Sequence, residues 1–415
     1  MRLRPSGLPR EVTVLSAVAF SVAIGFGIVA PALPLLARSF DVGDFASSAV
    51  ISVFAFMRLI SAFGGGALVD RMGERRILAI GIGIVAVSSA LAGAAPNYWA
   101  LLLLRGVGGI GSAMFTVSAM SLLLRSVPPA ARARAQSMFA ASFLFGGILG
   151  PALGGLVTNS SPRPPFFIYA GTLTVAGTIG LLALPRTRLS APVDEGGTTT
   201  TTPLSVALRN PAYRSALASA AAQNWAAFSV RISLIPLFVT ATVANGGLGL
   251  DARWTGLGLS LSGLVNGVAL VPAGRYADRR GRKPLLVIGL ILLAISTALL
   301  ALAGGLPLYL VSMVVFGPAS ALLSVAPAAI VGDVIEGRGG RAVAGFQMAG
   351  DFGSIVGPLL AGALADAYSY SVAFAVTAAL LVVPLAVAVA APETRRASEP
   401  DVATPPTLAA TDGSP

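Results

Sequence analysis

Residues Gly66-Ala-Leu-Val-Asp-Arg-Met-Gly-Glu-Arg-Arg76 and Gly274-Arg-Tyr-Ala-Asp-Arg-Arg-Gly-Arg-Lys283 repeat one short polar phrase, and this repetition decides the fold. Each copy follows a long apolar run and precedes another. The two aspartates of the phrase, Asp70 and Asp278, are 208 residues apart. A polar segment that recurs after half the chain indicates two similar membrane halves, which favours a transporter over an enzyme.

The composition is that of a membrane protein. The chain is 55% hydrophobic and only 11% charged, whereas about a quarter of the residues in a soluble domain are charged. It has no cysteine and no histidine, which excludes disulfides, thiolate metal sites and imidazole chemistry. We therefore predict no catalytic site, no metal and no cofactor, and expect any proton chemistry to use carboxylates.

Apolar runs between polar breaks predict twelve transmembrane helices in two sets of six. The first set lies near 12–37, 46–69, 77–95, 98–124, 135–158 and 165–185, and the second near 213–243, 254–274, 284–303, 307–332, 342–365 and 370–391. The first run exceeds the 7–15 residues of a usual signal-peptide core, so we take it as an uncleaved span. The predicted fold is an all-α integral membrane protein with an N-terminal six-helix bundle (1–188), a cytoplasmic linker (189–212), a C-terminal six-helix bundle (213–394) and a disordered cytoplasmic tail (395–415).

The positive charges predict the orientation. With the N-terminus inside, the cytoplasmic segments hold 22 of the arginines and lysines and the outer loops hold 3. This asymmetry follows the positive-inside rule, so we predict two cytoplasmic termini in the plasma (inner) membrane. It also explains the net charge of +11 without a nucleic-acid partner.

The repeated phrase resembles the signature of the major facilitator superfamily between helices 2 and 3. The residues that match are Gly66, Leu68, Asp70, Arg71, Gly73, Arg75 and Arg76, and in the second copy Gly274, Asp278, Arg279, Gly281, Arg282 and Lys283. The resemblance implies two six-helix bundles around a central cavity that opens to each side in turn, and a small-molecule substrate. It also implies a latch on the cytoplasmic side, so the candidate gating residues are Gly66, Asp70, Arg71, Gly73, Arg75, Gly274, Asp278, Arg279 and Gly281. The alternative is a solvated turn that only ends a helix.

Two further motifs narrow the resemblance. Leu104-Arg-Gly-Val-Gly-Gly-Ile-Gly-Ser-Ala113 resembles the helix 4 motif, in which an intramembrane arginine precedes small residues. Phe145-Gly-Gly-Ile-Leu-Gly-Pro-Ala-Leu-Gly-Gly155 resembles the helix 5 motif of drug:proton antiporters, with candidate residues Gly146, Gly147, Gly150, Pro151, Gly154 and Gly155. Its Gly-Pro pair recurs 207 residues later at 357–358. The motif implies proton-driven export, and ordinary tight packing is the alternative.

Charged residues inside predicted spans are costly and therefore informative. They are Arg58, Arg105, Arg231 and Asp351. Arg58 and Asp351 lie at similar depths, about 18 and 15 Å from one membrane face at 1.5 Å per residue, and helices 2 and 11 are neighbours in the superfamily. We therefore predict an Arg58–Asp351 ion pair that forms or breaks during transport, and take Asp351, Arg105 and Arg58 as proton-coupling candidates. A static pair, or an Asp351 bonded within its own half, is the alternative.

Three intramembrane arginines against one acid favour a neutral or anionic substrate. Candidate substrate contacts are polar or aromatic residues of the second half, each of which could equally make an interhelical hydrogen bond: Gln223, Asn224, Trp225, Arg231, Asn266 and Gln347. The leading prediction is a monomeric, proton-driven transporter that exports small organic molecules or drugs and contacts only its substrate and lipid. The alternative is uptake of a small neutral or anionic metabolite by proton symport or uniport.

Overall fold

The computed structural model describes residues 8–128, 131–184, 203–335 and 340–394, and this part of the chain is helical with no strand. The first bundle consists of α1 (Arg10–Val29), α2 (Ala32–Arg38), α3 (Asp44–Met72), α4 (Glu74–Gly93), α5 (Tyr98–Arg125), α6 (Arg132–Thr158) and α7 (Pro164–Ala183). The second consists of α8 (Leu204–Ala207), α9 (Pro211–Trp225), η2 (Ala226–Leu234), α10 (Ile235–Thr240), η3 (Val243–Asn245), α11 (Ala252–Arg280), α12 (Arg282–Ala301), α13 (Leu306–Val334), α14 (Gly340–Ala367), α15 (Tyr370–Leu380) and α16 (Val382–Ala390). The predicted tail at 395–415 and most of the predicted linker lie outside the described residues.

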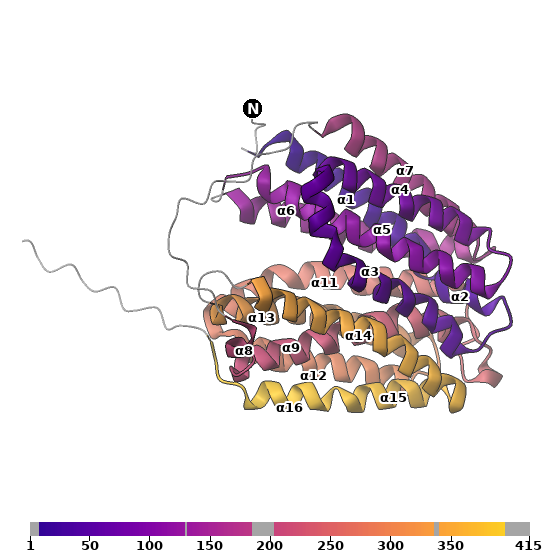
Figure 1. The fold of residues 1–415 in the computed structure, drawn as a ribbon. Coiled ribbons are helices and arrows are strands. Elements are labelled where there is room, and N and C mark those ends of the chain that lie inside the picture. Colours follow the sequence, from indigo (N-terminus) through magenta and orange to yellow (C-terminus); the bar gives the residue numbers. More distant parts are fainter. Residues whose placement is uncertain (1–7, 129–130, 185–202, 336–339, 395–415) are drawn as a thin grey trace, which may run out of the picture.

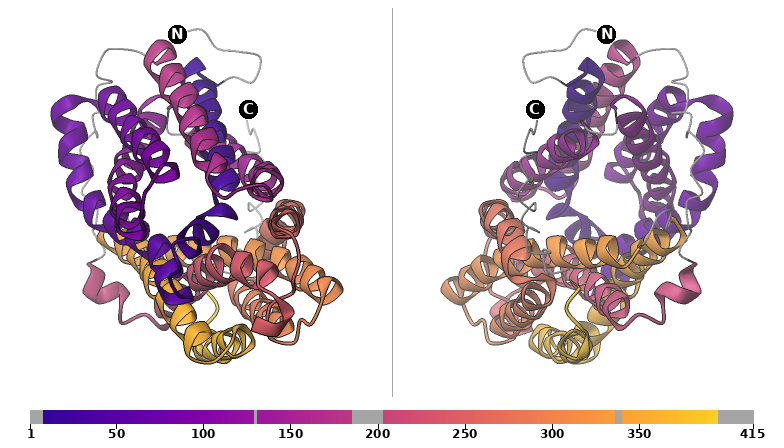
Figure 2. Two further views of the ribbon diagram at one scale, coloured as in Figure 1. Left: turned by 90° about the vertical axis from the view of Figure 1, so that its right-hand side faces the viewer. Right: turned by 90° about the vertical axis from the view of Figure 1, so that its left-hand side faces the viewer.

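The helices form two bundles that lie side by side. Figure 1 shows the indigo-to-magenta helices of the first bundle above the rose-to-yellow helices of the second, and Figure 2 shows the same division along the helix axes. The bundles meet where α3 packs on α14 and where α6 packs on α11. This confirms the predicted all-α, two-bundle architecture, including the contact between the second and eleventh spans.

Eleven helices in the described part of the chain are long and apolar enough to cross a membrane. The predicted span at 213–243 is not among them, because it consists of three segments, α9, η2 and α10. Its middle segment, η2, is a nine-residue π-helix that ends with the N–H of Ile235 bonded to the carbonyl of Val230. Pro236 follows directly and has no N–H to donate to the preceding turn. π-Helices are rare, and those that occur often lie at functional sites. This one carries three residues of the central cavity described below.

The two copies of the polar phrase form the ends of helices rather than loops. Helix α3 continues to Met72 and α11 to Arg280, so the predicted ends at 69 and 274 are too early. Apolarity marks the part of a helix inside the membrane, whereas the hydrogen-bonded backbone continues beyond it. Each helix stops at a glycine in the left-handed region, Gly73 (φ 85°) and Gly281 (φ 103°), whose N–H bonds back to the carbonyl four residues earlier. This conformation strains any residue with a Cβ, which explains the glycine in each copy.

The two bundles repeat one ion pair with its charges exchanged. Glu74, at the start of α4, lies 2.9 Å from Arg125 at the end of α5. The residues 208 positions later, Arg282 and Asp333, start α12 and end α13, and their side chains lie 3.1 Å apart. Glu74 is buried at 4% exposure, whereas the side chain of Arg125 is 29% exposed, so the pair is shielded from water on the side of the acid. Equivalent helices are therefore joined at the same place in both bundles, although the acid and the base have exchanged positions.

We expect Glu74→Arg to destabilise the protein, because it places two positive charges together in a buried site. Removing one partner of a buried pair costs about 3–5 kcal/mol. The double variant Glu74→Arg/Arg125→Asp reproduces the order of charges found at Arg282 and Asp333 and should recover most of the lost stability. Thermal unfolding of both variants checks this. A double variant no more stable than the single one would show that the pair does not join the helices.

Candidate functional site

One end of the interface between the bundles is sealed by a carboxylate that caps a helix of the other bundle. We call this region the closed end, and it comprises residues 38–48 and Gly155 of the first bundle and Ser233, Gly256 and residues 362–370 of the second. The carboxylate of Asp366 accepts hydrogen bonds from the backbone N–H groups of Asp44 (2.6 Å) and Phe45 (2.8 Å), at the start of α3. An acid at a helix N-terminus satisfies free N–H groups and interacts favourably with the helix dipole. This cap therefore links α14 to α3 across the two bundles.

Side chains around this cap extend the closed end. Arg38 forms an ion pair with Asp44, which is 5% exposed, and Tyr370 adds its hydroxyl to the same cluster. Ser233 of η2 donates to Ser48 of α3, with 2.6 Å between the oxygens. These hydrogen bonds join the two bundles at the closed end, and Figure 1 shows the ribbons diverging toward the other end, where α1 begins.

Glycines let the backbones touch across the interface. A Cβ on Gly155 of α6 would lie 2.9 Å from the Cα of Gly256 in α11. A Cβ on Gly362 of α14 would lie 2.8 Å from the Cα of Phe45 and 2.7 Å from the hydroxyl of Ser48 in α3. Gly155 and Gly362 are 207 residues apart, and Ser48 and Gly256 are 208 apart. The contacts are therefore copies of each other on the two sides of the closed end.

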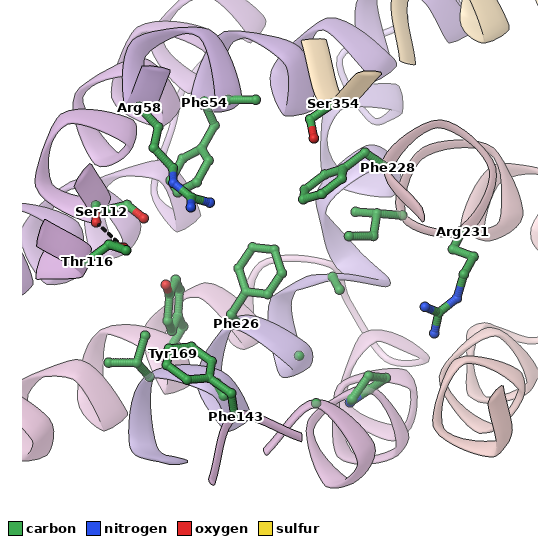
Figure 3. Close-up of a pocket in the computed structure, with 18 of the residues that line it drawn as sticks. Phe26, Phe54, Arg58, Ser112, Thr116, Phe143, Tyr169, Phe228, Arg231 and Ser354 are labelled. Carbon is green, nitrogen blue, oxygen red and sulfur yellow. Dashed lines mark hydrogen bonds between the residues drawn. The ribbon is translucent and has the colours of Figure 1, made fainter. Parts of the chain in front are cut away.

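A cavity of about 410 Å³ lies between the bundles. Rings from six different helical segments line it: Phe26, Phe54, Phe115, Phe143, Tyr169 and Phe228. Figure 3 shows Phe26, Phe54, Tyr169 and Phe228 around its interior. Three charged residues line it as well, Arg58 of α3, Arg231 of η2 and Asp351 of α14. An apolar chamber with a few polar groups is typical of a small-molecule site.

The three charged side chains have different surroundings. Arg231 donates to the Ser262 hydroxyl (2.6 Å) and the Leu259 carbonyl (3.3 Å), and its guanidinium lies 4.6 Å from the centre of the Phe316 ring. It is therefore bound within its own bundle, and Figure 3 shows it turned toward the neighbouring helices. Arg58 instead directs its guanidinium into the cavity (Figure 3).

Arg58 and Asp351 face the same cavity from different bundles. Their opposite charges interact electrostatically, but no ion pair within 4.0 Å joins them among the described residues. The predicted pair is thus brought together in space without direct contact in this conformation. Whether it closes during transport stays a prediction.

The sequence matches the description "Major Facilitator Superfamily" over residues 15–247 and 226–411, which together cover most of the chain. The chain belongs to the major facilitator superfamily. It is therefore a multi-pass membrane transporter and not an enzyme, and members of this superfamily bind small-molecule substrates within the membrane.

Two similar proteins are named for drug resistance. The quinolone resistance protein NorA of Staphylococcus aureus is 28% identical over 174 residues, which is 42% of this chain and 43% of NorA. The chain thus matches less than half the length of NorA. The multidrug resistance protein MdtG of Salmonella choleraesuis is 27% identical over 397 residues, covering 91% of this chain and 95% of MdtG.

Solved structures of other transporters have the same fold. A bacterial homologue of the lysosomal transporter Spinster, in an inward-facing and unoccupied conformation, superposes with a TM-score of 0.74 at 15% identity and covers 92% of this chain and 96% of its own. The nucleoside transporter NupG superposes with a TM-score of 0.71 at 15% identity and covers 92% of this chain and 98% of its own. At this identity the likeness establishes the superfamily fold alone.

The superfamily's helix 4 motif lies behind the cavity wall. Arg105 is 3% exposed, and its guanidinium lies 4.4 Å from the centre of the Phe54 ring, which itself lines the cavity. Its neighbour in the motif, Gly109, lets α5 approach α3, because a Cβ there would lie 3.1 Å from the backbone nitrogen of Arg58. Arg105 thus supports the wall without reaching the chamber, and its predicted coupling role is indirect in this geometry.

The helix 5 motif serves three different surfaces. Gly146, Gly150 and Gly154 pack against the backbone of α1 within the first bundle. Gly155 meets α11 of the second bundle. Gly147 and Pro151 line the cavity, and a Cβ on Gly147 would meet nothing within 4 Å. Packing therefore accounts for four of its glycines, and the antiporter role of the motif stays a prediction.

Most of the predicted substrate contacts lie outside the cavity. Gln223 donates to the Ser320 hydroxyl of α13 at 2.8 Å, and Asn224 to the carbonyl of Ala220 in its own helix at 3.1 Å. Trp225 packs against α14 at Gly353 and Gly357. The remaining two differ in burial. Asn266 has a buried amide oxygen with no hydrogen-bond partner in the described chain, and Gln347 is exposed. Of the six candidates, Arg231 alone lines the described cavity.

The candidate gating residues lie at the end opposite the closed end. Arg75 donates to the carbonyl of Leu181 and so binds the end of α7. Asp278 is largely exposed and lies 3.9 Å from Arg282 in its own bundle. The surroundings of Gly66 and the side chain of Asp70 lie outside the described part of the chain. Arg71 and Arg279 each have interaction partners, and a Cβ on Gly274 would meet nothing within 4 Å. The latch between bundles stays a prediction.

Two groups of functional residues have no signal in the sequence. The aromatic wall consists of rings in apolar spans, where a cavity-facing phenylalanine and a lipid-facing one have the same surroundings in sequence. Asp366 follows a predicted span like any loop acid, and its partners are backbone groups more than 320 residues away. Gly43 makes room for the contact, since a Cβ there would lie 2.6 Å from an oxygen of Asp366, but this role is visible only in the structure.

We expect Asp366→Asn to open the closed end. The amide accepts only one of the two backbone hydrogen bonds well and carries no charge for the helix dipole, and such charge-assisted bonds contribute about 1.5–3 kcal/mol. The population open at this end should rise about tenfold or more. Spin labels on Trp99→Cys and Val243→Cys report the distance between the bundles, because both positions are exposed and the chain has no other cysteine.

Asp251→Asn is the control, since Asp251 is an acid of the same end whose side chain is 52% exposed. If the label distances of the Asp366 and Asp251 variants match those of the wild type, the cap does not hold the bundles together.

We expect Gly155→Ala to widen the same distance distribution, because the new Cβ collides with the backbone of α11. Gly147→Ala in the same motif is the matched control, since its Cβ enters open space. Equal effects of the two alanines in the spin-label measurement would contradict a closed end built on backbone contact.

Proposed function

We propose that this chain exports small organic molecules in exchange for protons across the cell (inner) membrane, with both termini in the cytoplasm. One observation carries the proposal: an acid and a base on opposite bundles, Asp351 and Arg58, line the same cavity and interact electrostatically without direct contact. The names of MdtG and NorA, two proteins similar in sequence, support export of drug-like compounds.

The charge of Asp351 provides a link between protonation and the position of the bundles. When its carboxylate is ionised, it attracts Arg58 and draws α14 toward α3 in a medium of low dielectric constant, where the attraction is strong. A proton on Asp351 removes this attraction. The force between the bundles therefore depends on the proton, which is what coupled transport requires of a carrier that alternates between two conformations.

The proposed orientation assigns the closed end to the outer side. The arginine-rich loops then lie in the cytoplasm, and the cavity receives its substrate from there. Opening of the outer end breaks the Asp366 cap, releases the substrate and lets a proton reach Asp351. Return to the conformation described here delivers that proton to the cytoplasm.

Uptake of a neutral or anionic solute is the second candidate function. It is favoured by the charges of the cavity, which are two arginines and one acid. The known nucleoside transporter NupG supports it only through the shared fold.

We expect substrates to collapse a proton gradient in inverted membrane vesicles acidified inside, and Asp351→Asn to abolish this response. The measurement is the fluorescence of a pH-sensitive dye during addition of cationic, neutral and anionic aromatic compounds. Asp251→Asn, an exposed acid, should behave as the wild type. A response that survives in Asp351→Asn would place the proton elsewhere, and movement of solute down its own gradient without proton movement would favour uniport.

A further inference from the structure

We propose that the cavity binds aromatic carboxylates, and that the carboxylate of the substrate competes with Asp351 for Arg58. The inference rests on the proposed function only in placing the substrate in this cavity, and it holds for export and uptake alike. It is drawn from the surroundings of the charged groups and from the distribution of the aromatic rings.

Arg58 is the available anion-binding group of the cavity. It makes no hydrogen bond and no direct ion pair with any described residue, while its guanidinium is directed into the chamber (Figure 3). Arg231 is unsuitable, because Ser262, the Leu259 carbonyl and the Phe316 ring already surround it. A guanidinium binds a carboxylate through two parallel hydrogen bonds, and it holds its charge throughout the physiological range.

Asp351 is the internal competitor for this group. It lines the same cavity from the opposite bundle and interacts with Arg58 over a distance longer than an ion pair. It makes no hydrogen bond with a described residue. The two charges are thus only partly compensated, and a ligand carboxylate that reaches Arg58 gains the contact that Asp351 does not make in this conformation.

The rest of the cavity suits an aromatic body. Five of its six rings come from the first bundle, the bundle that also carries Arg58. The rings of Phe115 and Phe143 lie 6.4 Å apart at an interplanar angle of 47° and form a continuous wall. Phe228 of the second bundle lies across the chamber from Phe143 (Figure 3). Stacked or edge-on rings at such spacing favour aromatic ligands over aliphatic ones of equal size.

The test is equilibrium binding to the purified full chain in lipid nanodiscs, without a proton gradient. The probes are anthracene-9-carboxylate, its uncharged carboxamide and the cation 9-(aminomethyl)anthracene, which differ in charge and share one ring system. We expect the carboxylate to bind most tightly. Arg58→Gln should weaken carboxylate binding about tenfold or more, as expected for a lost charge-assisted hydrogen bond, and leave carboxamide binding nearly unchanged. Arg58→Lys keeps the charge but not the two parallel hydrogen bonds, so its affinity for the carboxylate should lie between those of the wild type and Arg58→Gln.

Two further variants separate the exchange from general damage. Asp351→Asn should tighten carboxylate binding, because it removes the competitor for Arg58. Phe228→Ala should weaken carboxylate and carboxamide alike, and Arg253→Gln, an exposed arginine, should change neither. Thermal unfolding verifies that each variant is folded.

Several results would overturn the inference: no binding of the carboxylate, equal affinity for carboxylate and carboxamide, tighter binding of the cation, or carboxylate binding weakened by Asp351→Asn. None of these bears on proton exchange, because binding is measured without a gradient. Conversely, a failure of proton flux with intact, Arg58-dependent carboxylate binding would contradict the proposed coupling and leave this site in place.

Discussion

Backbone contact through glycine is the constraint on which the arrangement of the two bundles depends. At the closed end, Gly155 meets Gly256, and Gly362 meets the first turn of α3. Water does not drive association between helices in lipid, so the attraction comes from close packing and interhelical hydrogen bonds. Both need backbones to approach, and a single methyl group at either glycine would collide with main-chain atoms. The cap by Asp366 is possible only because Gly362, one turn earlier, has already brought α14 onto α3.

The internal repeat explains why these contacts come in pairs. A duplicated bundle places each helix twice, so the crossing of α6 on α11 has a copy in the crossing of α14 on α3. The reversed ion pairs, Glu74–Arg125 and Arg282–Asp333, show what a repeat preserves. The two pairs occupy equivalent positions and each joins an acid to a base, but the acid and the base have exchanged places. The two halves of this chain therefore share the geometry of the contact and not the identity of its residues.

The sequence predicts the fold well because membrane helices have a strong local signal. Length and apolarity reveal the spans, and the repeated phrase reveals the two halves. The seventh span shows the limit of this reasoning, since an apolar run cannot distinguish an α-helix from one interrupted by a π-helical segment.

The site is less predictable from the sequence because it depends on the direction in which each side chain points. The sequence identifies Arg58, Arg231 and Asp351 as unusual, but only the structure reveals that Arg231 is engaged with Ser262 and that Arg58 faces the chamber. Gln223 and Asn224 are polar for the same reason as many membrane residues, to bond neighbouring helices or their own backbone.

The two bundles also differ at equivalent positions, and these differences show what each bundle contributes to the seal and to the cavity. The residue 207 positions before Asp366 is Asn159, which is exposed at the end of α6, whereas Asp366 caps α3. The seal is therefore charged on one side of the interface only.

The two bundles also contribute unequally to the cavity, because the first bundle supplies five of the six rings and the second supplies the acid. A ligand that spans the chamber must contact both bundles, so its binding energy acts on their separation. In a symmetric carrier, ligand and proton would act equally on both sides; here Arg58 and Asp351 lie on α3 and α14, the same two helices that the Asp366 cap joins. The proposed change in attraction between these two charges therefore acts on the same two helices that the cap holds together at the closed end.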